Sequence, residues 1–376
     1  MNCKPPRYPH RPKSLQASVL AVALVASFAA APAYADWVCD LDGVEGIDGP
    51  NANGDGAFAC GDNAWADGEG ATALGAHAFA TAPRATAVGR GASAIEMGSV
   101  AVGWEASARE GAISIGYDSR AGIDSTVIGR EAQTVATNAV IVGARGQAGE
   151  NATAIGSSSI ANGQGSTAVG YISEATGQFS TALGQFARAL SDTATAVGAG
   201  AYAQGEFTTA IGTQSNATGQ WSTAVGQDAQ ATATQATALG RSSRATDLGT
   251  TAVGVGANAT AIYATALGNA ASAASQSVAL GANATASGIQ SVAAGVSAQA
   301  TGQGTTAIGD LARATGYGAV GLGWDAQALQ DYSVAVGAGS RATRAYTVSF
   351  GHTDGLRRQL VNIAEGTQDY DPALFD

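Results

Sequence analysis

The chain has few of the residues that build catalytic sites, with only three histidines and three cysteines among 376 residues. His77 and His352 lie far apart in the sequence. Neither a metal-binding cluster nor a Ser-His-acid set therefore has a spacing that supports it. The sequence predicts no catalytic residues, no metal site and no cofactor, and we expect a protein that is not an enzyme.

Positive charge is also scarce. Charged residues make up 12% of the chain, the formal net charge is −11, and lysine occurs only at Lys4 and Lys13. A chain of this kind releases few counterions from phosphate backbones or from anionic lipid headgroups. We therefore expect no nucleic acid as a partner. No segment after residue 35 approaches the ~20 consecutive apolar residues of a membrane helix, so we expect no membrane insertion by these residues.

Residues 1–35 have the features of a signal peptide. A basic start is followed by an apolar run over 15–31, and Ala33-Tyr34-Ala35 places small residues where signal peptidase reads them. A signal anchor is the alternative interpretation. Export agrees with the two remaining cysteines, Cys39 and Cys60, for which we predict a disulfide, with two free thiols as the alternative.

One phrase repeats from Gly75 to Gly351 at a spacing of 13 or 14 residues. It consists of a small polar residue, Thr or Val, Ala, an aliphatic residue and Gly, as in Ser166–Gly170. A fixed short period is typical of stacked-repeat proteins. A weaker x-x-A-x-A phrase follows each glycine, and turn residues such as Gly177-Gln178 come after it. The sequence therefore predicts an all-β parallel solenoid whose coils each contain two short strands and two turns.

The repeat also predicts which side chains face inward. Alternate residues of a strand face opposite sides, so Thr167 and Val169 share one face while Ser166 and Ala168 share the other. We expect the aliphatic residues to form the inner seam of the solenoid. The Ser, Thr and Ala residues are expected to form an outer ladder, suited to close contact with identical chains in a symmetric homo-oligomer.

With these features, the chain resembles the heads of the YadA-like trimeric autotransporter adhesins over Asn51 to Gly351. A second segment, Arg358–Thr367, is similar to the neck that follows the last head coil in that family. The resemblance implies a left-handed parallel β-roll packed as a homotrimer. It also implies a neck, with Arg358, Gln359, Asn362 and Gly366, that crosses between subunits and locks the trimer.

The resemblance divides the chain into four segments: a signal peptide (1–35), an N-terminal cap with the predicted disulfide (36–61), the head repeats (62–351) and the neck-like segment (352–376). Members of this family continue into a coiled-coil stalk and a membrane anchor, for which residues 352–376 leave no room. We therefore expect a fragment or a truncated reading frame, with a head that lacks its own anchor as the alternative. Residues 51–62 also imitate a calcium loop, but they start with Asn and lack the final Glu.

The family implies an adhesin head at the cell surface or outer membrane, which attaches to extracellular-matrix proteins or cells through many weak contacts. A structural fibre for autoaggregation and biofilm formation is the alternative. The ligand surface is expected at large residues that break the small-residue rule. These candidates are Trp104, Phe179, Phe186, Phe207, Trp221, Tyr263 and Trp324.

Overall fold

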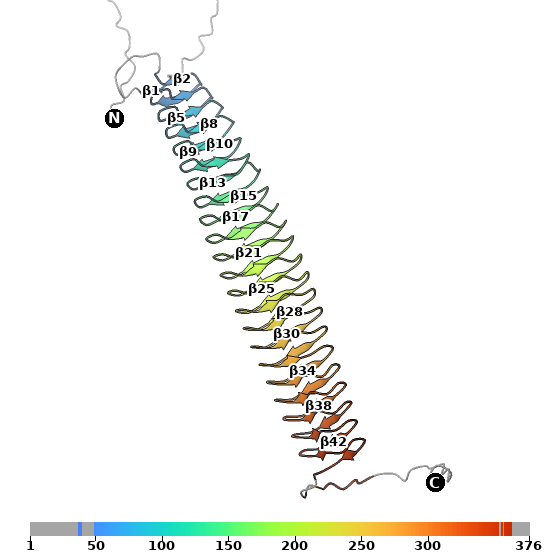
Figure 1. The fold of residues 1–376 in the computed structure, drawn as a ribbon. Helices are drawn as coiled ribbons and strands as arrows, with labels where there is room; N and C mark the ends of the chain where they lie inside the picture. Colours follow the sequence, from blue (N-terminus) through green and yellow to red (C-terminus); the bar gives the residue numbers. More distant parts are fainter. Residues whose placement is uncertain (1–36, 40–48, 353–354, 356, 363–376) are drawn as a thin grey trace, which may run out of the picture. The chain divides into compact units, whose positions relative to one another are not determined.

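The structure is a computed structural model that describes residues 37–39, 49–352, 355 and 357–362. It divides into two compact units, Met1–Gln204 and Gly205–Asp376. Within each unit, coils of the chain stack one upon the next (Figure 1). Each coil contains one strand of usually three residues, called the long strand, and one of two residues, called the short strand. The described residues contain no helix, so the predicted all-β parallel solenoid is confirmed.

In the first unit, the long and short strands alternate along the chain, except that no short strand lies between β13 and β14, where Gln133 forms only isolated bridges. The long strands are β1 (Trp37–Cys39), β3 (Phe58–Cys60), β5 (Thr72–Leu74), β7 (Thr86–Val88), β9 (Val100–Val102), β11 (Ile113–Ile115), β13 (Thr126–Ile128), β14 (Val140–Val142), β16 (Thr153–Ile155), β18 (Thr167–Val169), β20 (Thr181–Leu183) and β22 (Thr195–Val197). The short strands are β2 (Asn51–Ala52), β4 (Trp65–Ala66), β6 (Phe79–Ala80), β8 (Ser93–Ala94), β10 (Ser107–Ala108), β12 (Arg120–Ala121), β15 (Gln147–Ala148), β17 (Ile160–Ala161), β19 (Glu174–Ala175), β21 (Arg188–Ala189) and β23 (Tyr202–Ala203).

The second unit repeats this order. Its long strands are β24 (Thr209–Ile211), β26 (Thr223–Val225), β28 (Thr237–Leu239), β30 (Thr251–Val253), β32 (Thr265–Leu267), β34 (Val278–Leu280), β36 (Val292–Ala294), β38 (Thr306–Ile308), β40 (Val320–Leu322), β42 (Val334–Val336) and the two-residue β44 (Val348–Ser349). Its short strands are β25 (Asn216–Ala217), β27 (Gln230–Ala231), β29 (Arg244–Ala245), β31 (Asn258–Ala259), β33 (Ser272–Ala273), β35 (Thr285–Ala286), β37 (Gln299–Ala300), β39 (Arg313–Ala314), β41 (Gln327–Ala328) and β43 (Arg341–Ala342).

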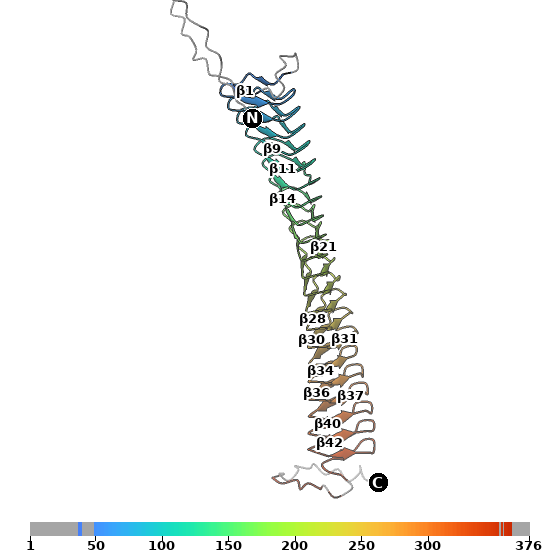
Figure 2. The same cartoon turned by 90° about the vertical axis from the view of Figure 1, so that its left-hand side faces the viewer.

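Strands of neighbouring coils pair in parallel and in register, so equivalent residues form ladders. In β18 and β20, for example, Thr167 pairs with Thr181 and Val169 with Leu183. The long strands and the short strands form separate sheets on opposite sides of the coil, as Figure 2 shows for β30 and β31 and for β36 and β37. Residues 14 apart in the sequence therefore stack above one another, and they form a column either on the surface or in the core.

The prediction for the two faces of the long strand is wrong, because the structure reverses it. Ala168 and Ser166 are buried, whereas Thr167 and Val169 are half-buried on the outer face. The aliphatic position is more open still in other coils, as at Ile115, where 37% of the residue is exposed. The inner seam is therefore made of Ala and Ser, and the aliphatic ladder lies outside.

The closeness of the two sheets explains why small residues fill the core. Ala168 in the long strand and Ala175 in the short strand are both fully buried. Ile141 is a larger core residue, and the coil accommodates it with a glycine: a Cβ built on Gly146 would lie 2.5 Å from Cγ2 of Ile141. Interiors are packed too densely to accept an extra methyl group at such a distance.

The glycine that ends the repeated phrase makes close stacking possible. Gly170 has φ of 141°, and a Cβ there would lie 2.3 Å from the carbonyl oxygen of Gly184 in the next coil. Any other residue would push the two coils apart. Many buried serines form a local hydrogen bond, as Ser180 Oγ does by donating to the carbonyl oxygen of Gly177 at 2.7 Å. Ser166 Oγ and Ser222 Oγ are buried without a hydrogen-bond partner among the described residues.

Candidate interaction surfaces

Each coil has two turns, and these turns display the largest side chains. The first turn follows the long strand, as in Gly103-Trp104-Glu105, and the second follows the short strand, as in Gly177-Gln178-Phe179. One residue in each of these turns has a left-handed backbone, with φ of 55° at Glu105 and 54° at Phe179. Side chains at the turns point away from the core because the chain reverses there.

The predicted ligand residues all lie at these turns and are exposed. Phe179 is the most open of them, with 64% of the residue exposed. Trp104, Phe186 and Trp324 occupy first turns, and Phe179, Phe207, Trp221 and Tyr263 occupy second turns. Within each unit, the structure therefore divides them between first turns and second turns and does not gather them at one kind of turn. Their role in ligand binding remains a prediction.

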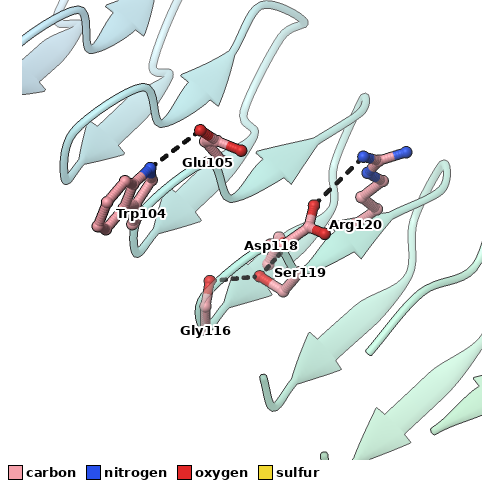
Figure 3. A network of polar contacts seen from close by, with 7 residues as sticks. Trp104, Glu105, Gly116, Asp118, Ser119 and Arg120 are labelled. Carbon is pink, nitrogen blue, oxygen red and sulfur yellow. Dashed lines mark hydrogen bonds and ion pairs between the residues drawn. The ribbon is translucent and has the colours of Figure 1, made fainter. Parts of the chain in front are cut away.

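Trp104 is fixed by its neighbours in the first unit (Figure 3). Its indole Nε1 donates a hydrogen bond to Glu105 Oε1 at 2.9 Å. Tyr117, one coil later, packs edge-to-face against it with ring centroids 5.7 Å apart, and the Arg90 guanidinium lies 5.4 Å from its ring centroid. Such contacts stabilise an exposed ring at about 1 kcal/mol each. An aromatic side chain held in this way presents a rigid surface.

Several second-turn aromatics are held in a different way, because the ring lies over a glycine of the preceding coil. A Cβ on Gly165 would lie 2.8 Å from Cδ1 of Phe179, and one on Gly249 would lie 2.7 Å from Cδ1 of Tyr263. The glycine and the ring occupy the same turn position one coil apart. The ring thus covers backbone that a side chain would otherwise cover.

The sequence reasoning missed a tyrosine ladder in the second unit. Tyr317 and Tyr332 pack edge-to-face with centroids 5.3 Å apart, and Tyr332 stacks on Tyr346 at 5.2 Å with an interplanar angle of 19°. Desolvation in this stack, with further effects from Tyr317, Tyr346 and Asp331, raises the pKa of the Tyr332 phenol above its usual value. The 14-residue spacing of Tyr332 and Tyr346 was the signal that could have revealed the ladder.

A further aromatic pair was also missed. Trp65 of β4 and Phe79 of β6 are direct cross-strand neighbours on the outer face of the short strands. Trp65 is exposed and Phe79 is half-buried. Both side chains are much larger than Ser93, the next residue of that column.

The outer face of the long strands forms the most continuous apolar surface in each unit. Almost every coil contributes one aliphatic side chain to it, and a Thr, Val or Ile lies beside that side chain in the same strand. In the first unit this aliphatic ladder consists of Leu74, Val88, Val102, Ile115, Ile128, Val142, Ile155, Val169, Leu183 and Val197. In the second unit it consists of Ile211, Val225, Leu239, Val253, Leu267, Leu280, Ile308, Leu322 and Val336, with Ala294 as the small member.

The predicted disulfide is partly within the described residues. Cys60 is disulfide-bonded, and the parallel pairing of β1 with β3 aligns Cys39 directly with Cys60. Whether Cys39 is the partner remains a prediction.

The strands β2 and β3 of the predicted cap pair with those of the next coil, so residues 51–60 form a coil of the roll. Asn53 Nδ2 of this coil donates to Asp67 Oδ1 of the next coil at 2.9 Å. Among the described residues, no group of three or more His, Cys, Asp or Glu side chains is arranged to hold a metal ion.

The neck-like residues are only partly described. Arg358 folds against the last coil, where its guanidinium donates hydrogen bonds to Ser340 Oγ and to the carbonyl oxygens of Phe350 and Ala338. Gln359 and Asn362 are exposed, and Gly366 lies outside the described residues. Their role as a trimer lock therefore remains a prediction.

The predicted signal peptide, residues 1–35, lies outside the described residues as well. In the part that is described, no helix is long and apolar enough to cross a membrane.

One family model matches much of the chain. The family model of the YadA head domain repeat matches ten stretches that together span more than half of the chain: 52–78, 80–106, 148–173, 175–201, 203–220, 217–243, 245–271, 272–296, 286–312 and 314–340. Among solved structures, the chain is similar to the collagen-binding domain of the Yersinia adhesin YadA. The identity is 26%, the match covers 53% of this chain and 79% of that one, and the TM-score is 0.20. A search of curated protein sequences gives no significant match.

Proposed function

We propose that this chain, which belongs to the family of the YadA head domain repeat, is an adhesin head that attaches to extracellular-matrix proteins or cells. The main observation in support is that the repeated and the irregular residues of each coil have different places in the structure. The repeated residues build the core and the two sheets, whereas the large irregular side chains are exposed at the turns. Exposed aromatic residues on a rigid scaffold are typical of protein contact surfaces.

Repetition makes weak contacts effective. Equivalent turns recur every 13 or 14 residues, so a repetitive or extended partner can contact several coils at once. Linked contacts raise the overall affinity well above that of any single one. Matrix proteins have this extended character, and they are the partner class that we propose.

We further propose that the chain forms a homotrimer through the aliphatic ladder. Large contiguous apolar surfaces on exported proteins mark interaction sites, and identical chains with identical stripes can cover one another symmetrically. Ile155 and Leu183, which are both exposed in the single chain, belong to this surface. Arg358, Gln359, Asn362 and Gly366 are proposed to add the neck contact that holds three chains together.

The proposed site of action is the outside of the cell. Residues 1–35 are proposed to direct export as a signal peptide, and the Cys39–Cys60 bridge would form in that oxidising compartment. Attachment at the cell surface or outer membrane is part of the same proposal.

Purified residues 36–376 can test the adhesin function in a binding assay with immobilised collagen, fibronectin and laminin, run beside an aggregation assay. Binding to a matrix protein that weakens at least tenfold in Trp221→Ala, with unchanged thermal stability, would support a ligand role for this turn. Gln235→Ala is a suitable control, since Gln235 occupies the same left-handed turn position one coil later. Aggregation without matrix binding would instead support the structural-fibre alternative.

The trimer is tested separately by the mass of the protein in solution, with and without residues 352–376. A trimer that dissociates when these residues are removed would support both the apolar interface and the neck. A monomer in both cases would contradict the proposed assembly.

A further inference from the structure

The second unit carries a cluster of arginines where its last coil meets the neck-like residues. A cavity of about 440 Å³ lies there, lined by Arg341, Arg344, Arg357, Arg358 and His352 together with small residues, Val348 and Phe350. Arg341 comes from β43, Arg344 from the turn after it, and the other two arginines from the segment after the roll. The fold thus gathers four guanidinium groups from three places around one open space.

These arginines have no carboxylate partner within the part of the chain that the structure describes. Four other arginines do have a carboxylate partner, for example Arg145 with Glu131 at 2.7 Å and Arg188 with Glu174 at 2.9 Å. Arg358 donates to Ser340 Oγ and to two carbonyl oxygens, none of which carries a negative charge. Four arginines gathered at one place in a chain of net charge −11 mark a local anion site.

The chemistry of the cavity favours an oxyanion. Guanidinium groups present planar pairs of N–H donors that match carboxylate and sulfate oxygens, and they stay charged at any physiological pH. Arginine is the sole cationic residue type with a permanent charge in this cavity, because the chain has no lysine after Lys13.

The tyrosine ladder adjoins this cavity. The turn that supplies Arg344 and Thr347 to the cavity wall also carries Tyr346, which stacks on Tyr332. Tyr346 is the more open of the two rings. Tyrosine rings combine an apolar face with a polar hydroxyl, which suits the apolar face and hydroxyl groups of a sugar ring.

We propose that this end of the second unit binds an acidic polysaccharide, with its sulfate or carboxylate groups at the arginines and its sugar rings against Tyr346. A nucleic acid fits less well, since a phosphate backbone needs cations along its whole length and these arginines are confined to one place. The proposal does not depend on the adhesin function, because it concerns a different partner class, although the cavity shares Arg358 with the proposed neck contact.

Binding of purified residues 36–376 to dextran sulfate, hyaluronate and neutral dextran tests the proposal. We expect dextran sulfate or hyaluronate to bind and neutral dextran not to bind. The two acidic polymers distinguish sulfate from carboxylate as the group that is recognised. Binding of neutral dextran, or tighter binding of a single-stranded oligonucleotide of similar length, would overturn the proposal.

A matched pair of variants locates the site. The combined substitution Arg341→Gln, Arg344→Gln and Arg357→Gln should weaken binding at least tenfold and lower its salt dependence. Arg241→Gln, Arg244→Gln and Arg313→Gln removes the same charge from the same unit without touching this cavity, and it should leave binding within twofold. Arg358 is kept in both because it contacts the last coil. Equal loss in both variants would show that only net charge matters and would overturn the assigned site.

Tyr346→Ala separates ring stacking from charge. Binding should weaken several-fold with an unchanged salt dependence, whereas Gln290→Ala, at an equivalent turn position outside the ladder, should have no effect. Unfolding temperatures of all variants show whether each one remains folded. An unchanged affinity in a folded Tyr346→Ala protein would contradict the role of the tyrosine.

Discussion

The ring of Phe179 lies directly over Gly165, at the same turn position one coil earlier, so that a Cβ on Gly165 would lie 2.8 Å from Cδ1 of the ring. Gly165 has a left-handed backbone, with φ of 65°. The pair explains how a large side chain can be exposed and yet fixed. A large turn residue of one coil therefore fits where the preceding coil has a glycine at the same turn position.

Gly165→Ala should destabilise the roll both through its left-handed backbone and through contact with the ring. Gly98→Ala is the matched control, because Gly98 has φ of 67° at the same turn position and no atom within 4 Å of a built Cβ. We expect Gly165→Ala to cost about 1–3 kcal/mol more than the control, the usual range for overpacking. Urea denaturation measures both free energies of unfolding.

The same pair can be tested by a double substitution. If contact with the ring causes the extra cost, Phe179→Ala should remove most of it in the Gly165→Ala background. Equal destabilisation by Gly165→Ala with and without Phe179 would mean that the ring does not press on this position.

Substitutions at neighbouring residues of the long strand should affect stability differently, because one residue faces the core and the next faces outward. Ala168 is fully buried against the short strand, so Ala168→Val should destabilise by about 1–3 kcal/mol through overpacking. Val169 lies on the outer face, so Val169→Ala should change the stability of the single chain by under about 1 kcal/mol. Thermal and urea unfolding under monomeric conditions compare the two. A larger loss of stability for Val169→Ala than for Ala168→Val would contradict the observed burial and favour an inner aliphatic seam.

This reversal shows which parts of the fold could be predicted from sequence. The period, the two strands per coil and the stacking glycines follow from spacing and local chemistry, because each repeats in every coil. The inward face does not follow, because alternation separates Ser166 and Ala168 from Thr167 and Val169 without saying which pair is inside. Hydrophobicity favoured Val169, but the narrow space between the sheets is filled mainly by Ala and Ser, with Ile141 and Val127 as the larger exceptions.

The candidate surfaces show a similar limit. Exposure of Trp104 and Phe179 could be expected because they interrupt a small-residue pattern. The arginine cavity could not, since Arg341 and Arg358 are separated in sequence and meet only where the chain after the last coil folds back onto it. Contacts of that kind depend on the path of one irregular segment, which the repeat does not determine.

Acid should weaken the ion pair between Glu131 and Arg145, which lie in neighbouring coils. The hydrogen bond from Arg145 lowers the pKa of the Glu131 carboxyl below its ordinary 4.5, assisted by the charge of Arg130. A lowered pKa in the folded state gives stability that is present above the unfolded pKa and is lost as the pH falls through the folded one. Arg145→Gln should therefore reduce the drop in unfolding temperature below pH 4.5, with Arg188→Gln as a control that leaves Glu131 paired. Identical acid profiles for wild type and Arg145→Gln would contradict this contribution.

The disulfide prediction is tested by peptide mapping of the exported protein. Digestion without reductant should release one peptide pair that joins Cys39 to Cys60. Cys39→Ser and Cys60→Ser should each lower the free energy of unfolding by up to roughly 3 kcal/mol, because a bridge over a loop of about 20 residues restricts the unfolded chain. Free thiol at Cys39 in the mature protein would exclude the bridge.

The most direct test of the account is the mass in solution of residues 36–376 carrying Ile155→Asp and Leu183→Asp, compared with the wild type and with Ile160→Asp. Ile155 and Leu183 lie on the outer face of the long strands, whereas Ile160 lies on the outer face of the short strands. The aliphatic ladder predicts a trimeric wild type, a trimeric Ile160→Asp protein, and a folded monomer for the double variant. A double variant that remains a trimer would contradict the assignment of this face as the surface that joins the chains.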